Sequence, residues 1–167
     1  MSTGFNQLET RVKDLLDHLP ADALEANWSD AELSRQLTSK LGAAGQEAGW
    51  VVGSCLWPKA DDPRWPLDLA WLEMAEGRLK RVKMALAVEW SLDEGQILDH
   101  FQKLLAGRAD LRVMVLQQKT KDEASDRLAA LEAQIEGFGQ SAPGDRYLLA
   151  CSDFKSAAFT YRLHVCP

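Results

Sequence analysis

The hydrophobic pattern of the chain changes its period near residue 50, and this change constrains the fold more than any other feature. Before it, apolar residues recur at helical spacing in two segments, 5–19 and 30–48, and we expect Pro20 and Gly49 to end them. After it come short apolar runs rich in Val, Leu and Trp, which predict strands. The first three expected strands are 50–57, 67–74 and 81–90.

The rest of the chain alternates helices with strands. Capping boxes that begin at Ser29, Ser91 and Thr120 each have Glu three residues later, and they predict where three helices begin. A turn at 76–78 predicts that the second and third strands form a hairpin. This order predicts the α/β fold class, with a mixed sheet flanked by helices. The remaining expected elements are a helix over 92–106, a strand over 110–117, a helix over 121–136 and strands over 147–151 and 159–165.

The length of 167 residues fits a single domain with a sizeable core. The longest apolar run is 84–88, far shorter than a membrane span, and five charged residues interrupt the first twenty. We therefore expect a cytoplasmic protein with no signal peptide and no membrane partner. The three cysteines are widely spaced and odd in number, which predicts free thiols. They are Cys55, Cys151 and Cys166.

The balance of charge is acidic, with a formal net charge of −6. Nucleic-acid binding through the whole surface is therefore excluded, because neutralising phosphates needs a cationic face. One local basic cluster remains, at the expected hairpin, and it is the candidate for contacts with DNA phosphates. Its members are Arg78, Lys80, Arg81 and Lys83.

Two carboxylates stand within expected strands, where acidic residues are depleted and costly to bury. Asp68 lies in the run 66–71 and Glu89 in the run 85–91. On adjacent antiparallel strands they would face each other across roughly 5 Å. Two such carboxylates repel unless a divalent cation lies between them, and oxygen ligands suit Mg²⁺ or Mn²⁺. The alternative is structural, because Glu89 also lies where it would favour the dipole of the next helix.

Two short runs in this order of elements resemble the PD-(D/E)xK nuclease superfamily, which has the restriction-endonuclease-like fold. They are Leu67-Asp68-Leu69-Ala70-Trp71 and Val88-Glu89-Trp90-Ser91. The resemblance implies an αβββαβ core. With it the chain divides into an N-terminal helical extension (1–28), a nuclease-like core (29–118) and a C-terminal helix and strands (119–167).

The resemblance also implies a metal site. In that superfamily the Asp and the Glu bind Mg²⁺ or Mn²⁺ together with the main-chain carbonyl of the residue after the Glu, which is Trp90 here. A helix before the first strand sometimes supplies another acidic ligand, for which Glu47 is the candidate. The metal would activate a bound water and offset charge in the transition state.

The sequence departs from the pattern at the superfamily's lysine, two residues after the Glu, where this chain has Ser91. Lys103 is the candidate replacement, because it shares one stripe of the following helix with Gln96 and His100. It lies roughly 16 Å along that helix, so it reaches Glu89 only if the helix folds back across the strands.

Three functions remain open on this evidence. The first is a metal-dependent nuclease-like protein that hydrolyses DNA, for which the missing strand lysine predicts weak or undetectable activity. The second is a non-catalytic module of the same fold that binds a protein partner or forms a homodimer. The third is an unrelated small acidic protein of the inhibitor type, which mimics nucleic-acid charge.

Overall fold

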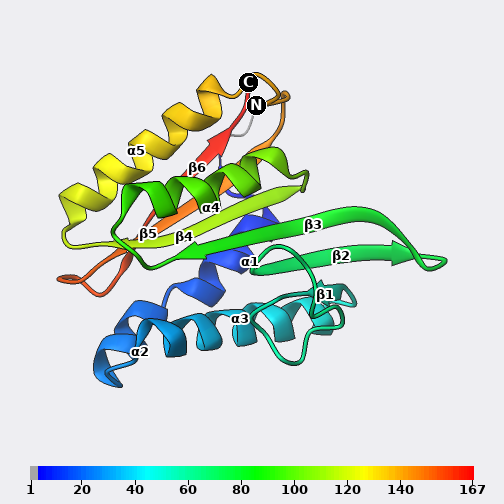
Figure 1. Ribbon diagram of the computed structural model, residues 1–167, viewed down its shortest axis with the longest axis horizontal. Coiled ribbons are helices and arrows are strands. Elements are labelled where there is room, and N and C mark those ends of the chain that lie inside the picture. Colours follow the sequence, from blue (N-terminus) through cyan, green and yellow to red (C-terminus); the bar gives the residue numbers. More distant parts are fainter. Residues whose placement is uncertain (1–3) are drawn as a thin grey trace.

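The computed structural model describes residues 4–167, which form a six-stranded mixed sheet between two layers of helices (Figure 1). The strands stand side by side in chain order. The two central connections, β3 to β4 and β4 to β5, join parallel strands, and the other neighbours are antiparallel. The strands are β1 (Val51–Gly53), β2 (Leu69–Ala75), β3 (Arg78–Glu89), β4 (Leu111–Gln118), β5 (Arg146–Asp153) and β6 (Phe159–Val165).

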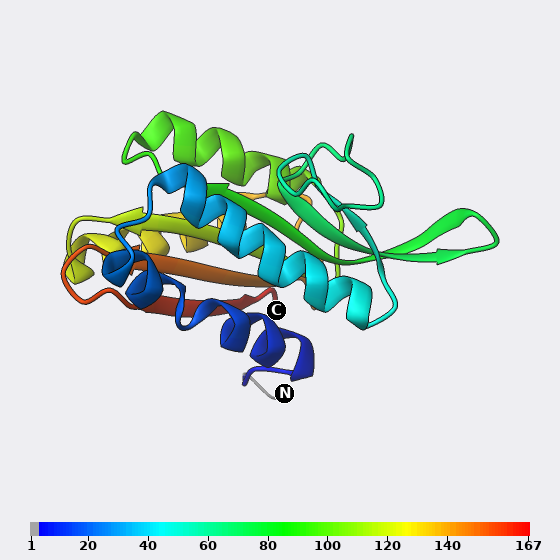
Figure 2. The same ribbon diagram turned by 90° about the horizontal axis from the view of Figure 1, so that it is seen from below.

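The helices divide between the two faces of the sheet. Parallel neighbours need a crossover, and two helices supply it on one face, α4 (Glu94–Ala106) and α5 (Lys121–Gly137). Three helices that precede the sheet in sequence cover the other face (Figures 1 and 2). They are α1 (Gln7–Leu16), α2 (Leu19–Glu25) and α3 (Asp30–Glu47).

The face under α3 is packed by tryptophans against glycines. A Cβ atom at Gly45 would overlap the indole of Trp71, and one at Gly42 would overlap the indole of Trp57. Because these positions carry no side chain, the ring of Trp71 lies against the helix, where its Nε1 donates to the carbonyl of Leu41 at 2.9 Å. This close approach fixes α3 on β2.

The face under α4 is built from smaller strand residues. Ala85 and Ala87 of β3 are buried against an apolar stripe of α4 that includes Ile97, Phe101 and Leu104. Alanines allow the helix axis to come close to the strand, because no large side chain separates them. The side chains that flank this stripe of α4 are consequently held over the ends of β2 and β3.

The β2–β3 hairpin extends beyond both helix layers (Figures 1 and 2). Its turn has positive φ at Glu76 (53°) and Gly77 (72°), as a two-residue turn with the twist of a hairpin requires. Leu79 near the tip is 47% exposed. The predicted hairpin is thus present, and its residues 74–81 are exposed to solvent.

The predicted α/β class, with a mixed sheet flanked by helices, is confirmed. Two details of the N-terminal half differ. Pro20 does not end a helix but lies in the first turn of α2, where proline is tolerated because the first amides of a helix have no intrahelical partner. Strand β1 is shorter than expected, because the Ser54 hydroxyl accepts from the amides of Leu56 and Trp57 and turns the chain.

The start of α4 also differs from the prediction. Its N-cap is Asp93, whose Oδ1 accepts from the amide of Gln96 at 2.9 Å. The hydroxyl of Ser91 accepts instead from the amide of Asp93 at 3.0 Å, one step before the helix. Ser29 and Thr120 are N-caps as predicted.

The three cysteines are free, as expected: Cys55 is exposed and the other two are buried. No helix within residues 4–167 is long and apolar enough to cross a membrane.

Candidate active site

Two carboxylates lie where β2 begins and β3 ends. Asp68 directly precedes β2, and Glu89 is the last residue of β3. The residues beside them, Leu69 and Val88, belong to the core under α3. Because successive strand residues point to opposite faces, Asp68 and Glu89 both point to the face that α4 covers.

Asp68 is held by the backbone of the neighbouring strand. Its Oδ2 accepts the amide of Val88 at 2.6 Å. Burial raises the pKa of Asp68, although the bond from Val88 and the nearby His100 and Lys103 lower it; Glu89 raises it further. Asp68 is therefore a half-buried carboxyl that costs free energy to ionise.

Glu89 is held by two contacts. Its Oε1 accepts the amide of Ser91 at 2.7 Å, and its Oε2 lies 3.3 Å from Nε2 of His100. Only 12% of the Glu89 side chain is exposed. The imidazole of His100 thus reaches from α4 to the end of β3, where it orients the carboxylate of Glu89.

Lys103 reaches the same site because α4 folds back over the sheet. A helix that connects two parallel strands runs antiparallel to both, so the residues of α4 return along β3 toward the start of β2 (Figure 1). His100, which contacts Glu89, and Lys103, three residues further along α4, therefore lie on the side of the sheet that carries the carboxylates. Lys103 is exposed and lowers the pKa of both Asp68 and Cys55, which shows that its charge acts here.

Cys55 is a member of the site that the sequence did not indicate. Its Sγ lies 3.5 Å from the carbonyl of Leu67, and burial and the charge of Asp68 raise its pKa. It arrives through the turn after β1, and no motif in the sequence connects it to Asp68.

The structure does not bring Glu47 to the site. It is the last residue of α3, exposed on the opposite side of the sheet, where it lines a surface cavity with His18 and Lys40. The prediction that Glu47 is a metal ligand is corrected for this reason.

The carbonyl of Trp90, a second predicted ligand, is engaged elsewhere. It accepts Nε2 of Gln117 at 2.6 Å, while the Trp90 indole donates to Ser34 on the α3 side. A carbonyl oxygen has a second lone pair, so a further contact requires only that a cation approach beside the Gln117 amide.

The donor set fits a hard cation better than zinc. Within residues 4–167 no three His, Cys, Asp or Glu side chains are grouped as metal ligands. Mg²⁺ and Mn²⁺ are often held by one or two carboxylates and complete their shells with water or substrate oxygens. Asp68 and Glu89 are ligands of this chemical type.

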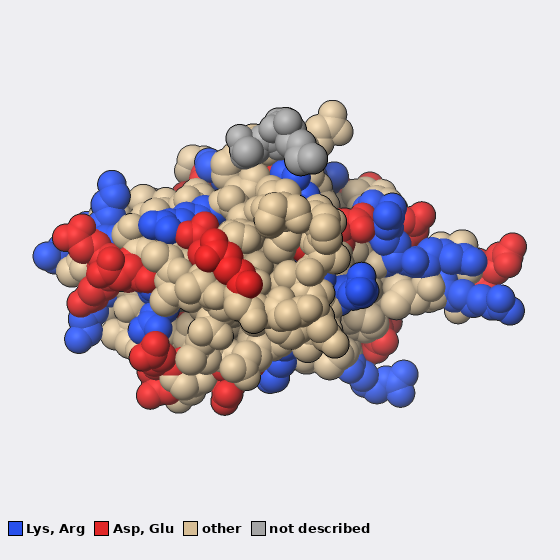
Figure 3. Space-filling model, turned by 90° about the horizontal axis from the view of Figure 1, so that it is seen from above, with Lys and Arg blue, Asp and Glu red and all other residues tan. Residues whose placement is uncertain are grey.

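The predicted basic cluster separates into two pairs. Arg81 and Lys83 both form ion pairs with Asp110, at 3.0 and 2.8 Å. Arg78 and Lys80 are exposed on the protruding hairpin and pair with no acid among the described residues (Figure 3).

No family model, curated protein or solved structure is significantly similar to this chain.

Proposed function

We propose that this chain is a nuclease-like protein that hydrolyses DNA phosphodiesters with Mg²⁺ or Mn²⁺ at Asp68 and Glu89. The observation that carries the proposal is the contact of His100 with Glu89, which brings α4 over this end of the sheet, with Lys103 three residues further along the same helix. Lys103 is our candidate for the role of the absent strand lysine. The order α3, β1, β2, β3, α4, β4 also agrees with the resemblance to the PD-(D/E)xK superfamily.

Each side chain has a distinct role in this proposal. When bound, the metal ion supplies a water of lowered pKa and neutralises charge on the phosphoryl oxygens. Asp68 and Glu89 hold the ion, and the metal offsets the cost of ionising the half-buried Asp68. His100 orients Glu89 through its 3.3 Å contact. Lys103 faces the phosphate and stabilises the charge that develops on it.

The exposed hairpin supports the choice of DNA as substrate. Arg78 and Lys80 carry unpaired positive charge on an arm that extends from the same two strands as the carboxylates. Such charges position a duplex through its phosphates without reading its sequence. Arg78 and Lys80 lie at the end of β3 that is farthest from Glu89.

The test is cleavage of plasmid, single-stranded DNA and RNA by the purified chain with Mn²⁺. We expect cleavage of DNA that is lost in Glu89→Gln and falls about 10²- to 10³-fold in Lys103→Ala, because a preorganised charge at the phosphoryl group is worth that much. The matched control is Lys155→Ala, which removes an exposed lysine from the β5–β6 loop.

Two results would contradict the proposal. Absence of cleavage in the wild type would exclude hydrolysis, and a Tm raised by Mn²⁺ in the wild type alone would then show a metal-binding protein without nuclease activity. Full activity in Lys103→Ala would show that Lys103 does not replace the strand lysine.

A further inference from the structure

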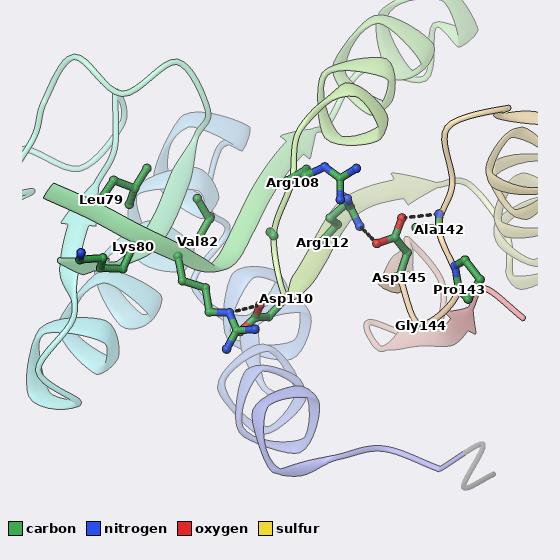
Figure 4. Close-up of a pocket in the computed structure, with 12 residues that line it drawn as sticks. Leu79, Lys80, Val82, Arg108, Asp110, Arg112, Ala142, Pro143, Gly144 and Asp145 are labelled. Atoms are coloured by element: carbon green, nitrogen blue, oxygen red, sulfur yellow. Dashed lines mark hydrogen bonds and ion pairs between the residues drawn. The ribbon is translucent and has the colours of Figure 1, made fainter. Parts of the chain in front are cut away.

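A cavity lies near the start of β3, at the opposite end of this strand from Glu89. Its volume is about 610 Å³, and it opens between the start of β4, the loop before β5 and the first residues of β3 (Figure 4). Four cationic and two acidic side chains line it, a local surplus of positive charge on an acidic protein. The charged residues are Lys80, Arg81, Arg108, Arg112, Asp110 and Asp145.

Arg112 is the central residue of this cavity. Its side chain is only 4% exposed, its Nε donates to the carbonyl of Gly107 at 2.9 Å, and its guanidinium lies 4.9 Å from the centre of the Tyr147 ring. Its Nη1 lies 3.3 Å from Asp145 Oδ1 but forms no hydrogen bond with any residue of 4–167. The ion pair with Asp145 holds the guanidinium in the wall of the cavity, where Arg112 contributes positive charge beside Lys80, Arg81 and Arg108.

The acidic residues of the cavity are already engaged. Asp110 lies between Arg81 and Lys83, and Asp145 accepts the amide of Ala142 at 3.0 Å besides its contact with Arg112. Their charges are therefore largely offset within the protein. Arg108 is exposed and pairs with no acid among the described residues, and in Figure 4 its guanidinium points to the part of the cavity that Arg112 lines.

An apolar cavity connects this site with Lys103. It has a volume of about 750 Å³, lies between α4 and the loop at 65–67, and includes Lys103 at one boundary. It shares Val82 and Arg108 with the basic cavity. The half-buried ring of Trp65 lines it, and aromatic rings of this kind stack on bases in single-stranded nucleic acids.

We propose that the cavity around Arg108 and Arg112 binds a backbone phosphate of a single-stranded nucleic acid whose bases occupy the apolar cavity. Arginine suits this role, because its planar guanidinium donates two parallel bonds to phosphate oxygens. The inference rests on the proposed function, since it places the strand on a path that leads to Lys103 and the carboxylates. It adds a phosphate-binding site that lies outside the catalytic cluster.

The test measures binding of a fluorescent single-stranded DNA by anisotropy, with EDTA present so that binding does not depend on the metal site. We expect Arg108→Gln to weaken binding roughly tenfold, by loss of a charged hydrogen bond. It should also lower the salt slope by about 1. Arg112→Lys, which keeps the charge but loses the paired donors, should weaken binding to a similar extent while the thermal transition remains cooperative.

Two further variants make the result specific. Arg35→Gln removes one arginine from the opposite side of the sheet and should leave binding unchanged within about twofold. Lys155→Ala, which removes an exposed lysine from the β5–β6 loop, should also bind normally.

The outcomes separate this inference from the proposed function. Weaker binding in Arg108→Gln supports the phosphate site even if the wild type cleaves nothing. Cleavage by the wild type with unchanged binding in Arg108→Gln would overturn the phosphate site and leave the nuclease proposal standing. A rise in Tm with inorganic phosphate that Arg108→Gln abolishes, together with equal oligonucleotide binding by both proteins, would assign the cavity to a small phosphate compound and overturn the nucleic-acid inference.

Discussion

The two faces of the sheet are covered by helices in different ways. Under α3 the strands present large side chains, such as Trp71, Met84 and Leu86, and the helix supplies glycines to receive the indoles. Under α4 the strand β3 presents alanines, and the helix contributes the large apolar side chains. Both faces are closely packed, and each holds polar side chains at strand ends. The buried Glu9 of α1 pairs with Arg146 at the start of β5, and His100 of α4 contacts Glu89 at the end of β3.

The difference shows how one strand can serve both stability and chemistry. Alternation along β3 places Leu86 and Val88 on the α3 face and Ala87 and Glu89 on the α4 face. The apolar face holds β3 in position, while the small residues on the other face let α4 approach until His100 contacts Glu89.

Trp71→Ala should give the largest loss of stability. Its side chain is 1% exposed, and its removal leaves a cavity at the α3 face and breaks the hydrogen bond from Nε1 to the carbonyl of Leu41. We expect the free energy of unfolding to fall by roughly 3–5 kcal/mol, measured by urea denaturation. A loss below about 1 kcal/mol would mean that α3 does not depend on this contact. Glu89→Gln, on the other face, is the comparison.

Ala87→Leu should disturb the α4 face in a different way. The added atoms have no space beneath the helix, so we expect a loss of about 1–3 kcal/mol. Displacement of α4 should also weaken the rise in Tm with Mn²⁺, because His100 would no longer orient Glu89. Ala129→Leu, at an exposed position of α5, is the control and should leave the Mn²⁺ response intact. An unchanged response in Ala87→Leu would show that the site does not depend on the close approach of α4.

Asp68→Asn should have the smallest effect on stability and the opposite sign. Burial raises the pKa of Asp68 above its ordinary value of 3.8, so the folded chain binds this proton more tightly than the unfolded chain. The stability that the protonated form contributes is present below pH 3.8 and is lost as the pH rises through the folded-state pKa. The amide carries no charge, and its oxygen can still accept from Val88.

Melting temperatures from acid to neutral pH measure this effect. Asp68→Asn should gain less than about 1 kcal/mol at neutral pH relative to the wild type and should lose the response to Mn²⁺. Lower stability than the wild type at neutral pH would mean that the charged hydrogen bond to Val88 outweighs the cost of burial.

Much of the fold was predictable from the chain alone. The change of period near residue 50, the N-caps at Ser29 and Thr120 and the turn at 76–78 are local signals, and each has its expected place in the structure. The predicted start of α4 was wrong by two residues. Ser91 and Asp93 are both good N-cap residues, and only the bend of the chain after Glu89 decides between them.

The candidate site was predictable only in part. Asp68 and Glu89 were indicated by chemistry that is unusual in strands, and their roles stay predictions. Glu47 could be excluded only once α3 was seen to lie on the opposite face. Arg108 and Arg112 carried no sequence signal, because their importance depends on the cavity that β4 forms with the loop before β5.

The sequence by itself determined the elements, because helical period, strand alternation and caps depend on residues a few positions apart. It also determined which face of β3 carries Glu89, since alternation is a local property. The tertiary structure decided that the charge of Lys103 acts on Asp68 and lowers its pKa, because the direction in which α4 returns follows from the parallel pairing of β3 with β4. That pairing depends on strands that are distant in sequence, and no local pattern encodes it.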